Sequence, residues 1–139
     1  PVSQPASRRV AVAFFSLLST GMHCGDPAQL SLGQPFSLRF GESAVLQREN
    51  VRLRFDSVPE DSRCPKTVQC VWAGNARVRL EITVGSAAPI VVELNTARGP
   101  REAEIEGFRI VLEDLAPYPL TSQPIPAKEF FATLSVLRT

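Results

Sequence analysis

The sequence predicts an all-β fold, either an antiparallel β-sandwich or a flattened Greek-key barrel of about seven to nine strands. Apolar and polar residues alternate along several short runs, which is the period of a strand with one buried face. Eight glycines and 12 prolines among 139 residues supply frequent turns. No run keeps the 3.6-residue period of an amphipathic helix. Two sheets that each have one apolar face are expected to bury those faces against each other.

Alternation marks seven expected strands in the part of the chain that begins at residue 36. The clearest run is 76–84, where five apolar residues are separated by Arg, Glu and Thr. The parity of the apolar positions changes across Gly107, which a tight hairpin there explains. No proline falls inside an alternating run, and Pro89 opens one. The expected strands lie at 36–40, 51–55, 76–84, 90–94, 103–105, 108–112 and 130–136.

The longest connection between expected strands, 116–127, contains four prolines. It is long enough to cross from one sheet to the other, as Greek-key topologies require. We therefore expect the strands on its two sides to lie in different sheets.

Residues 1–24 show the order of regions found in a secretory signal peptide. A short polar start ends in Arg8-Arg9, an apolar run follows at 10–18, and small residues follow that run. The apolar run is shorter than the roughly 20 residues that span a bilayer. We therefore expect a signal-peptide helix and export to the periplasm or cell envelope.

Cys24 stands where a bacterial lipoprotein carries its lipid-modified cysteine. The preceding Gly21-Met22-His23 departs from the usual pattern, and cleavage near Gly21 is the alternative. A lipid on Cys24 is the one membrane attachment that we expect. The expected organisation is a signal peptide at 1–24, of the lipoprotein type if Cys24 is modified, a tether at 25–35 and a single β-domain at 36–139.

Charge and composition exclude several function classes. The chain has 15 basic and 14 acidic residues, so it lacks the basic excess of a nucleic-acid-binding protein. Its one histidine, His23, lies in or beside the leader, which leaves a Ser-His-Asp or Cys-His site without a general base. No nucleotide-binding loop or Gly-x-Ser-x-Gly motif is present. The sequence therefore predicts a protein that is not an enzyme and uses no cofactor.

Cys64 and Cys70 are expected to form a disulfide in an oxidising export compartment. Closing a loop of this length without strain would stabilise the fold by roughly 2–2.5 kcal/mol. The spacing is neither that of a thioredoxin-like pair nor that of a zinc site. Trp72, two residues further on, is expected to pack over the disulfide or to cap the end of the barrel.

The segment around these cysteines reads Asp61-Ser62-Arg63-Cys64-Pro65, then Val68, then Cys70-Val71-Trp72-Ala73-Gly74-Asn75-Ala76. It resembles the signature of a family of small exported bacterial proteins, often lipoprotein candidates. The resemblance extends over about residues 36–136 and is most specific at the cysteines. It implies export, a β fold and a Cys64–Cys70 disulfide. The family has no assigned activity, so the resemblance implies no catalytic residue.

An acidic cluster is a weak candidate for calcium. Its members, Asp56, Glu60 and Asp61, lie close together with two serines, and oxygen ligands suit Ca²⁺. The spacing lacks the alternation and the turn glycine of an EF-hand. The favoured alternative is a solvated acidic turn in which Asp61 or Glu60 pairs with Arg63.

A basic face is a candidate for binding an anionic partner. The alternative is a solvated sheet face with Glu81 or Glu93 opposite the arginines. The basic residues share the polar side of two expected strands and are Arg52, Arg54, Arg77 and Arg79.

The sequence thus predicts a non-catalytic, exported β-sandwich protein that binds or supports another envelope component, an unidentified protein or ligand. One alternative is a protease inhibitor that presents the disulfide-closed loop 64–70. Its tip is Pro65, Lys66 and Thr67, with Lys66 entering a trypsin-like pocket. The other alternative is a carrier that holds a small ligand inside an open barrel.

Overall fold

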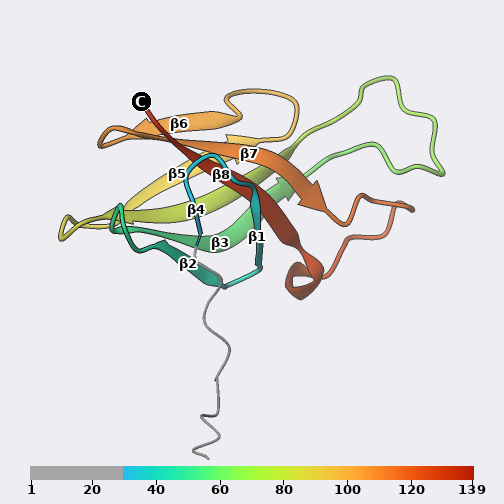
Figure 1. Cartoon of the computed structure of the whole chain (residues 1–139). Coiled ribbons are helices and arrows are strands. Elements are labelled where there is room, and N and C mark those ends of the chain that lie inside the picture. Colours follow the sequence, from blue (N-terminus) through green and yellow to red (C-terminus); the bar gives the residue numbers. More distant parts are fainter. Residues whose placement is uncertain (1–29) are drawn as a thin grey trace, which may run out of the picture.

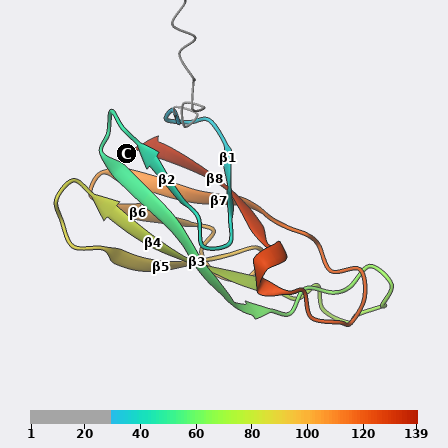
Figure 2. The same ribbon diagram turned by 90° about the horizontal axis from the view of Figure 1, so that it is seen from below.

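Two four-stranded antiparallel sheets make up residues 30–139, the part of the chain that the computed structural model describes (Figure 1). One sheet has the strand order β1-β8-β7-β6 and the other β2-β3-β4-β5. The sheets form two layers, seen from below in Figure 2. The elements are β1 (Phe36–Arg39), β2 (Ser43–Leu46), β3 (Val51–Asp61), β4 (Ala76–Val84), β5 (Ile90–Asn95), β6 (Glu102–Ile105), β7 (Phe108–Ala116), the 3-10 helix η1 (Ala127–Glu129) and β8 (Phe131–Arg138).

The predicted β-sandwich is confirmed, and its core forms as the alternation requires. In β4, for example, Leu80 and Ile82 have no exposed surface, whereas Arg79 between its buried neighbours points outward. Burying each such large apolar side chain contributes roughly 1.5–3 kcal/mol. Side chains from both sheets fill the space between the layers.

The leader and the first five residues of the expected tether, 25–29, lie outside the described residues, as do Arg8-Arg9 and Cys24. The last part of the tether is described, and it is attached to the sandwich. Leu30 and Leu32 are partly buried against the core, and the Gly33 N–H donates to the Val136 carbonyl over 2.8 Å. Residues 30–35 are therefore part of the domain. Within residues 30–139, no helix is long and apolar enough to cross a membrane.

All seven expected strands are present, but β2 was not predicted and β3 is longer than expected. β2 shows no alternation of apolar and polar residues, because Val45 is apolar although it is exposed on the outer side. The expectation that no proline lies within a strand is wrong for Pro59 in β3. The register of β3 against β4 shifts between Ser57 and Glu60. Pro59 lies in this irregular stretch, where no ladder hydrogen bond requires its missing N–H.

The hairpin expected at Gly107 is confirmed. Ile105 and Phe108 lie opposite each other in β6 and β7, and only Glu106 and Gly107 separate them. Both turn residues have positive φ, 49° and 82°, as a two-residue turn of the primed type requires.

The expectation that the 116–127 connection crosses between the sheets is wrong. β7 and β8, the strands on its two sides, are antiparallel neighbours in one sheet. The chain instead changes sheet between β1 and β2 and between β5 and β6. The long connection is used to reach a loop of the other sheet. The Pro119 carbonyl there accepts a hydrogen bond from the Lys66 N–H over 3.0 Å.

Candidate functional site

The segment with the family resemblance forms a long loop at one end of the sandwich. This cysteine loop, residues 62–75, joins β3 to β4, and it projects beyond the sheets (Figure 1). The predicted disulfide is present within it. The Cα atoms of Cys64 and Cys70 are 5.9 Å apart.

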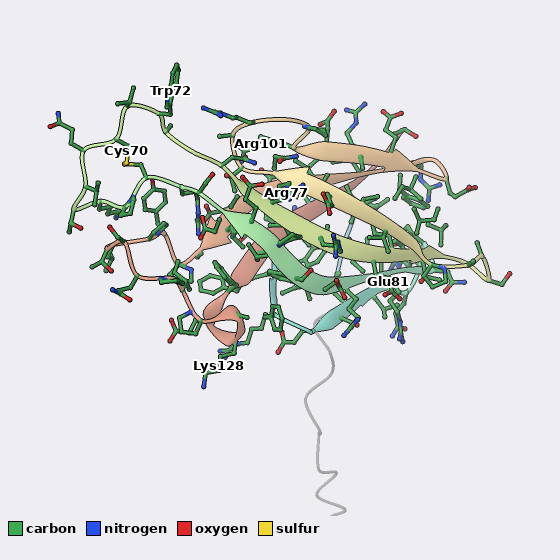
Figure 3. The ribbon with its side chains drawn as sticks, turned by 180° about the vertical axis from the view of Figure 1, so that it is seen from behind. Cys70, Trp72, Arg77, Glu81, Arg101 and Lys128 are labelled. Carbon is green, nitrogen blue, oxygen red and sulfur yellow. A yellow bond between two sulfur atoms is a disulfide. The ribbon has the colours of Figure 1, made fainter. Side chains whose placement is uncertain are left out.

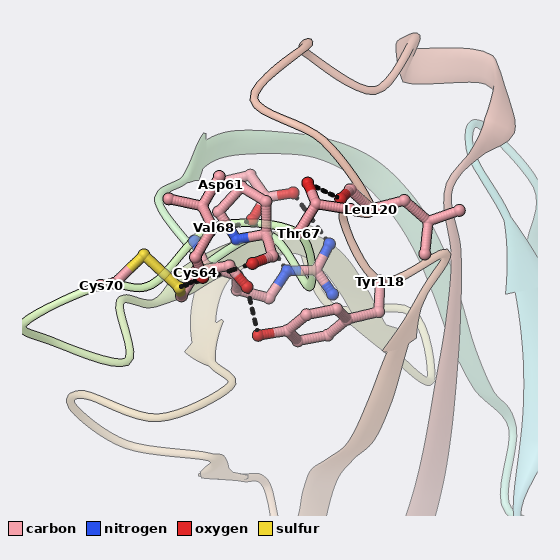
Figure 4. Close-up of a disulfide and its surroundings, with 9 residues drawn as sticks. Asp61, Cys64, Thr67, Val68, Cys70, Tyr118 and Leu120 are labelled. Carbon is pink, nitrogen blue, oxygen red and sulfur yellow. Dashed lines mark hydrogen bonds and ion pairs between the residues drawn. A yellow bond between two sulfur atoms is a disulfide. The ribbon is translucent and has the colours of Figure 1, made fainter.

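A second loop holds the cysteine loop in place. This proline loop, residues 117–126, lies between β7 and η1. The N–H and hydroxyl of Thr67 both donate to the Leu120 carbonyl, over 3.1 and 2.7 Å. The Tyr118 hydroxyl donates to the Cys64 carbonyl over 2.7 Å (Figure 4). The disulfide and these hydrogen bonds together restrict the conformations of the cysteine loop.

Arg63 joins the base of the cysteine loop to the end of β7. Its side chain is 6% exposed, and its Nε and Nη2 each donate to a different carboxylate oxygen of Asp61 over 2.8 Å. Its Nη1 donates to the Leu115 carbonyl over 2.7 Å, and Nη2 also donates to the Pro117 carbonyl over 3.0 Å. Such a two-pronged contact with a carboxylate requires the planar guanidinium of arginine. The predicted pairing of Asp61 with Arg63 is confirmed.

Asn75 joins the other side of the cysteine loop to the β5–β6 loop, residues 96–101. Its side chain is buried, and its Oδ1 accepts the N–H groups of Ala97 and Arg98, both over 3.0 Å. Its Nδ2 donates to Asn95 Oδ1 over 2.8 Å. No local sequence pattern predicts these contacts, because the partners of Asn75 lie about twenty residues further along the chain. This network fixes the backbone at Arg98.

The expectation that Trp72 covers the disulfide or caps the barrel is wrong. Trp72 is 73% exposed and the preceding Val71 is 90% exposed. Figure 3 shows the Trp72 side chain pointing away from the sheets. The Trp72 ring lies beside Arg98, whose guanidinium carbon is 5.8 Å from the ring centroid. Arg63 and Tyr118 already occupy the inner side of the loop, so the indole lies outside.

Exposed apolar side chains gather on the two loops. Half of the large hydrophobic residues that are exposed among residues 30–139 belong to them. Scattered single hydrophobic residues are normal on a surface, whereas a local group indicates a contact site. We call this group the loop-end surface, and its members are Val68, Val71, Trp72, Tyr118 and Leu120.

The candidate anion-binding face is largely neutralised by acidic neighbours. Arg54 lies opposite Glu81 across β3 and β4, and Arg79 lies opposite Glu93 across β4 and β5. The hydrogen bond from Arg79 holds the pKa of Glu93 below its usual range, and the positive charge of Arg77 adds to the effect. Glu81 and Glu93 thus lie opposite arginines, as expected for a solvated sheet face. Arg52 lies opposite Thr83, and the closest ion pairs are Arg79 with Glu93 at 2.8 Å, Arg77 with Glu60 at 3.1 Å and Arg54 with Asp56 at 3.4 Å.

The acidic residues considered for calcium lie in strand β3, and not in a loop as expected. Each contacts a different arginine, so their carboxylates are used in separate ion pairs. Residues 30–139 contain no group of three side chains arranged to hold a metal ion. The pairs are Asp56 with Arg54, Glu60 with Arg77 and Asp61 with Arg63.

In the loop considered for protease inhibition, the backbone N–H groups at the tip already donate hydrogen bonds within the protein. Residues 65–68 form a turn, closed by a hydrogen bond of 3.1 Å from the Val68 N–H to the Pro65 carbonyl. The N–H of Lys66 donates to the proline loop, and its ammonium lies 5.8 Å from the Tyr118 ring centroid. A peptide that binds along a protein edge needs an extended backbone with free hydrogen-bonding groups. This geometry argues against an inhibitory loop.

Comparison of the chain with family models, curated proteins and solved structures finds no match in any of the three. The family resemblance of the cysteine segment therefore stays a prediction.

Proposed function

We propose that the chain is an exported β-sandwich protein that binds a protein partner in the cell envelope through its loop-end surface. The observation that carries this proposal is the placement of Trp72. A large aromatic ring, 73% exposed, is presented on a loop that is closed by a disulfide and hydrogen-bonded to two neighbouring loops.

Physical chemistry supports a binding role for such a residue. Tryptophan, tyrosine and arginine are the residues most enriched among those that dominate binding energy at protein interfaces. Trp72 and Tyr118 belong to the loop-end surface, and Arg98 lies against the Trp72 ring. A restrained loop also loses less conformational entropy on binding than a free one. The surface is therefore prepared to bind before it meets a partner.

Export is supported by the leader pattern and by the cysteine pair. A disulfide persists in the periplasm or outside the cell, whereas cytosolic thiols are kept reduced. The proposed location and the proposed binding role are consistent, because the disulfide that closes the cysteine loop persists in an oxidising compartment.

Site-specific photocrosslinking in the native cells tests the proposal. A photoreactive residue at Val71 is expected to give one discrete protein adduct. The same residue at Val45 on β2, also an exposed valine but outside both loops, is the matched control and is expected to give none. Equal adduct patterns from the two positions, or no adduct from Val71, would contradict the proposal.

Trp72→Ala is expected to abolish the adduct from Val71 while the fold stays intact. Truncating a central tryptophan at an interface weakens binding by about 2 kcal/mol or more, whereas an exposed side chain changes the free energy of unfolding by about 0.5 kcal/mol or less. Urea denaturation checks the second value. An undiminished adduct in this variant means that Trp72 is not the anchor.

The inhibitor alternative makes an opposite prediction for trypsin. Because the Lys66 and Thr67 amides donate to the proline loop, we expect no inhibition by the purified protein at micromolar concentration. A chromogenic trypsin assay measures this. Inhibition that Lys66→Ala removes would favour the inhibitor over the binding module.

A further inference from the structure

The four edge strands of the sandwich are not equally protected. An edge strand presents unpaired backbone groups, and natural proteins protect edges by shortness, charge, proline or bulges. β1, β2 and β6 have four residues each, and β6 carries Glu102 and Glu104. β5 is the longest edge, with six residues that read Ile-Val-Val-Glu-Leu-Asn.

The outward backbone groups of β5 can be identified from the hydrogen bonds at its end. The Thr96 N–H donates to Ala76 at the start of β4 over 3.0 Å, whereas the Asn95 N–H donates to the Pro100 carbonyl over 2.9 Å. Asn95 therefore points its N–H away from β4. Because this direction alternates along a strand, Val91 and Glu93 also point their N–H and C=O groups away from β4. The β5–β6 loop covers only the Asn95 end.

The side chains of the open half of β5 do not prevent pairing. Ile90 is 40% exposed and Val91 is 59% exposed. Pro89 precedes the strand, and the strand itself contains no lysine, arginine or proline. The one charge, Glu93, turns toward its own sheet and hydrogen-bonds Arg79 over 2.8 Å. Among residues 30–139, no backbone hydrogen bond uses the outward donors and acceptors of Val91 and Glu93, and Ile90, Val91 and Val92 make this part of the edge largely apolar.

We propose that β5 pairs antiparallel with β5 of a second copy of this chain, around a two-fold axis at Val92. In this register the Val91 N–H and C=O meet the Glu93 C=O and N–H of the second copy, and the symmetry repeats the pair. The two Val92 side chains lie opposite each other. Each Glu93 faces a valine, and not the other carboxylate, so like charges are not placed directly opposite. The edge is thus complementary to itself.

The pairing joins the two β2-β3-β4-β5 sheets into one continuous sheet of eight strands. The cysteine loop lies near the Asn95 end of β5, because Asn75 bonds Asn95. Antiparallel strands place these ends on opposite sides of the two-fold axis, so the dimer presents its two loop-end surfaces in opposite directions. This dimer does not depend on the proposed function, since β5 residues 90–93 are separate from both loops.

The dimer is tested by sedimentation equilibrium on the purified full-length chain at micromolar concentrations. The wild type is expected to be a dimer, and Val91→Lys is expected to raise the dissociation constant by about tenfold or more. Val45→Lys is the matched control, because it places the same charge on the opposite edge of the same sheet, and it is expected to remain a dimer. A monomeric wild type, or equal dissociation by both variants, would overturn the proposal.

A second variant keeps the test decisive if Val91→Lys fails to fold. In the proposed register the two Val92 residues form a non-hydrogen-bonded pair, whose Cα separation of about 4.5 Å suits a disulfide. Val92→Cys is therefore expected to form an intermolecular disulfide on mild oxidation, seen as a dimer on non-reducing gels. The wild-type chain controls for any contribution of Cys24. Absence of the covalent dimer in folded protein would contradict the β5 pairing.

Discussion

Replacing Gly74 with alanine is expected to lower the free energy of unfolding by about 3 kcal/mol or more. Gly74 has a φ of +72°, which costs an L-residue roughly 1–2 kcal/mol. An alanine Cβ would also overlap the Ser62 carbonyl oxygen and lie 2.9 Å from the Arg63 Cα. These are backbone atoms, so no side-chain rotation relieves the contact. The two sides of the cysteine loop would have to separate at their base.

Gly85→Ala is the matched control for this prediction. Gly85 also has a positive φ, +59°, but a Cβ there would meet nothing within 4 Å. Its replacement should therefore cost only the backbone term of roughly 1–2 kcal/mol. Urea denaturation of both variants measures the difference. Equal losses would show that the close approach of Ser62 to Gly74 does not constrain the loop.

The sheets of this protein can be predicted from the sequence because a strand with one buried face has apolar residues at every second position. The alternation of 76–84 predicts β4, and the positive φ values of Glu106 and Gly107 agree with the hairpin inferred from parity. β2 escaped prediction because its four residues include an exposed valine. The extension of β3 through Pro59 was not predicted. Proline has no N–H to donate to a neighbouring strand, but Pro59 lies at a bulge, where no such hydrogen bond is needed.

The site is less predictable because its contacts are made between residues far apart in the chain. The cysteine pairing is local and was expected. The partners of Arg63 beyond Asp61 are carbonyls more than fifty residues away, at Leu115 and Pro117. No local sequence pattern predicts these two hydrogen bonds. The exposure of Trp72 is likewise set by contacts that are distant in the chain, because the cysteine loop is held by the proline loop and the β5–β6 loop.

Removing the guanidinium in Arg63→Met is expected to lower the free energy of unfolding by about 3 kcal/mol. The change leaves the Asp61 carboxylate, whose side chain is 17% exposed, without its two-pronged partner. It also leaves the Leu115 carbonyl without the buried donor that satisfies it. A buried charge or polar group that loses its partner pays its full desolvation cost.

Arg54→Met supplies the comparison, because Arg54 also pairs with an aspartate but is 46% exposed. Exposed pairs contribute about 0–1 kcal/mol, so this variant should unfold near the wild-type denaturant midpoint. The double change Asp61→Asn with Arg63→Met is expected to recover part of the loss, since it removes the unpaired charge as well. If Arg63→Met and Arg54→Met both lower the free energy of unfolding by less than about 1 kcal/mol, the contacts of Arg63 with Asp61 and Leu115 do not hold the cysteine loop. The rigid presentation of Trp72 would then rest on the disulfide, the Asn75 network and the Thr67 and Tyr118 contacts with the proline loop.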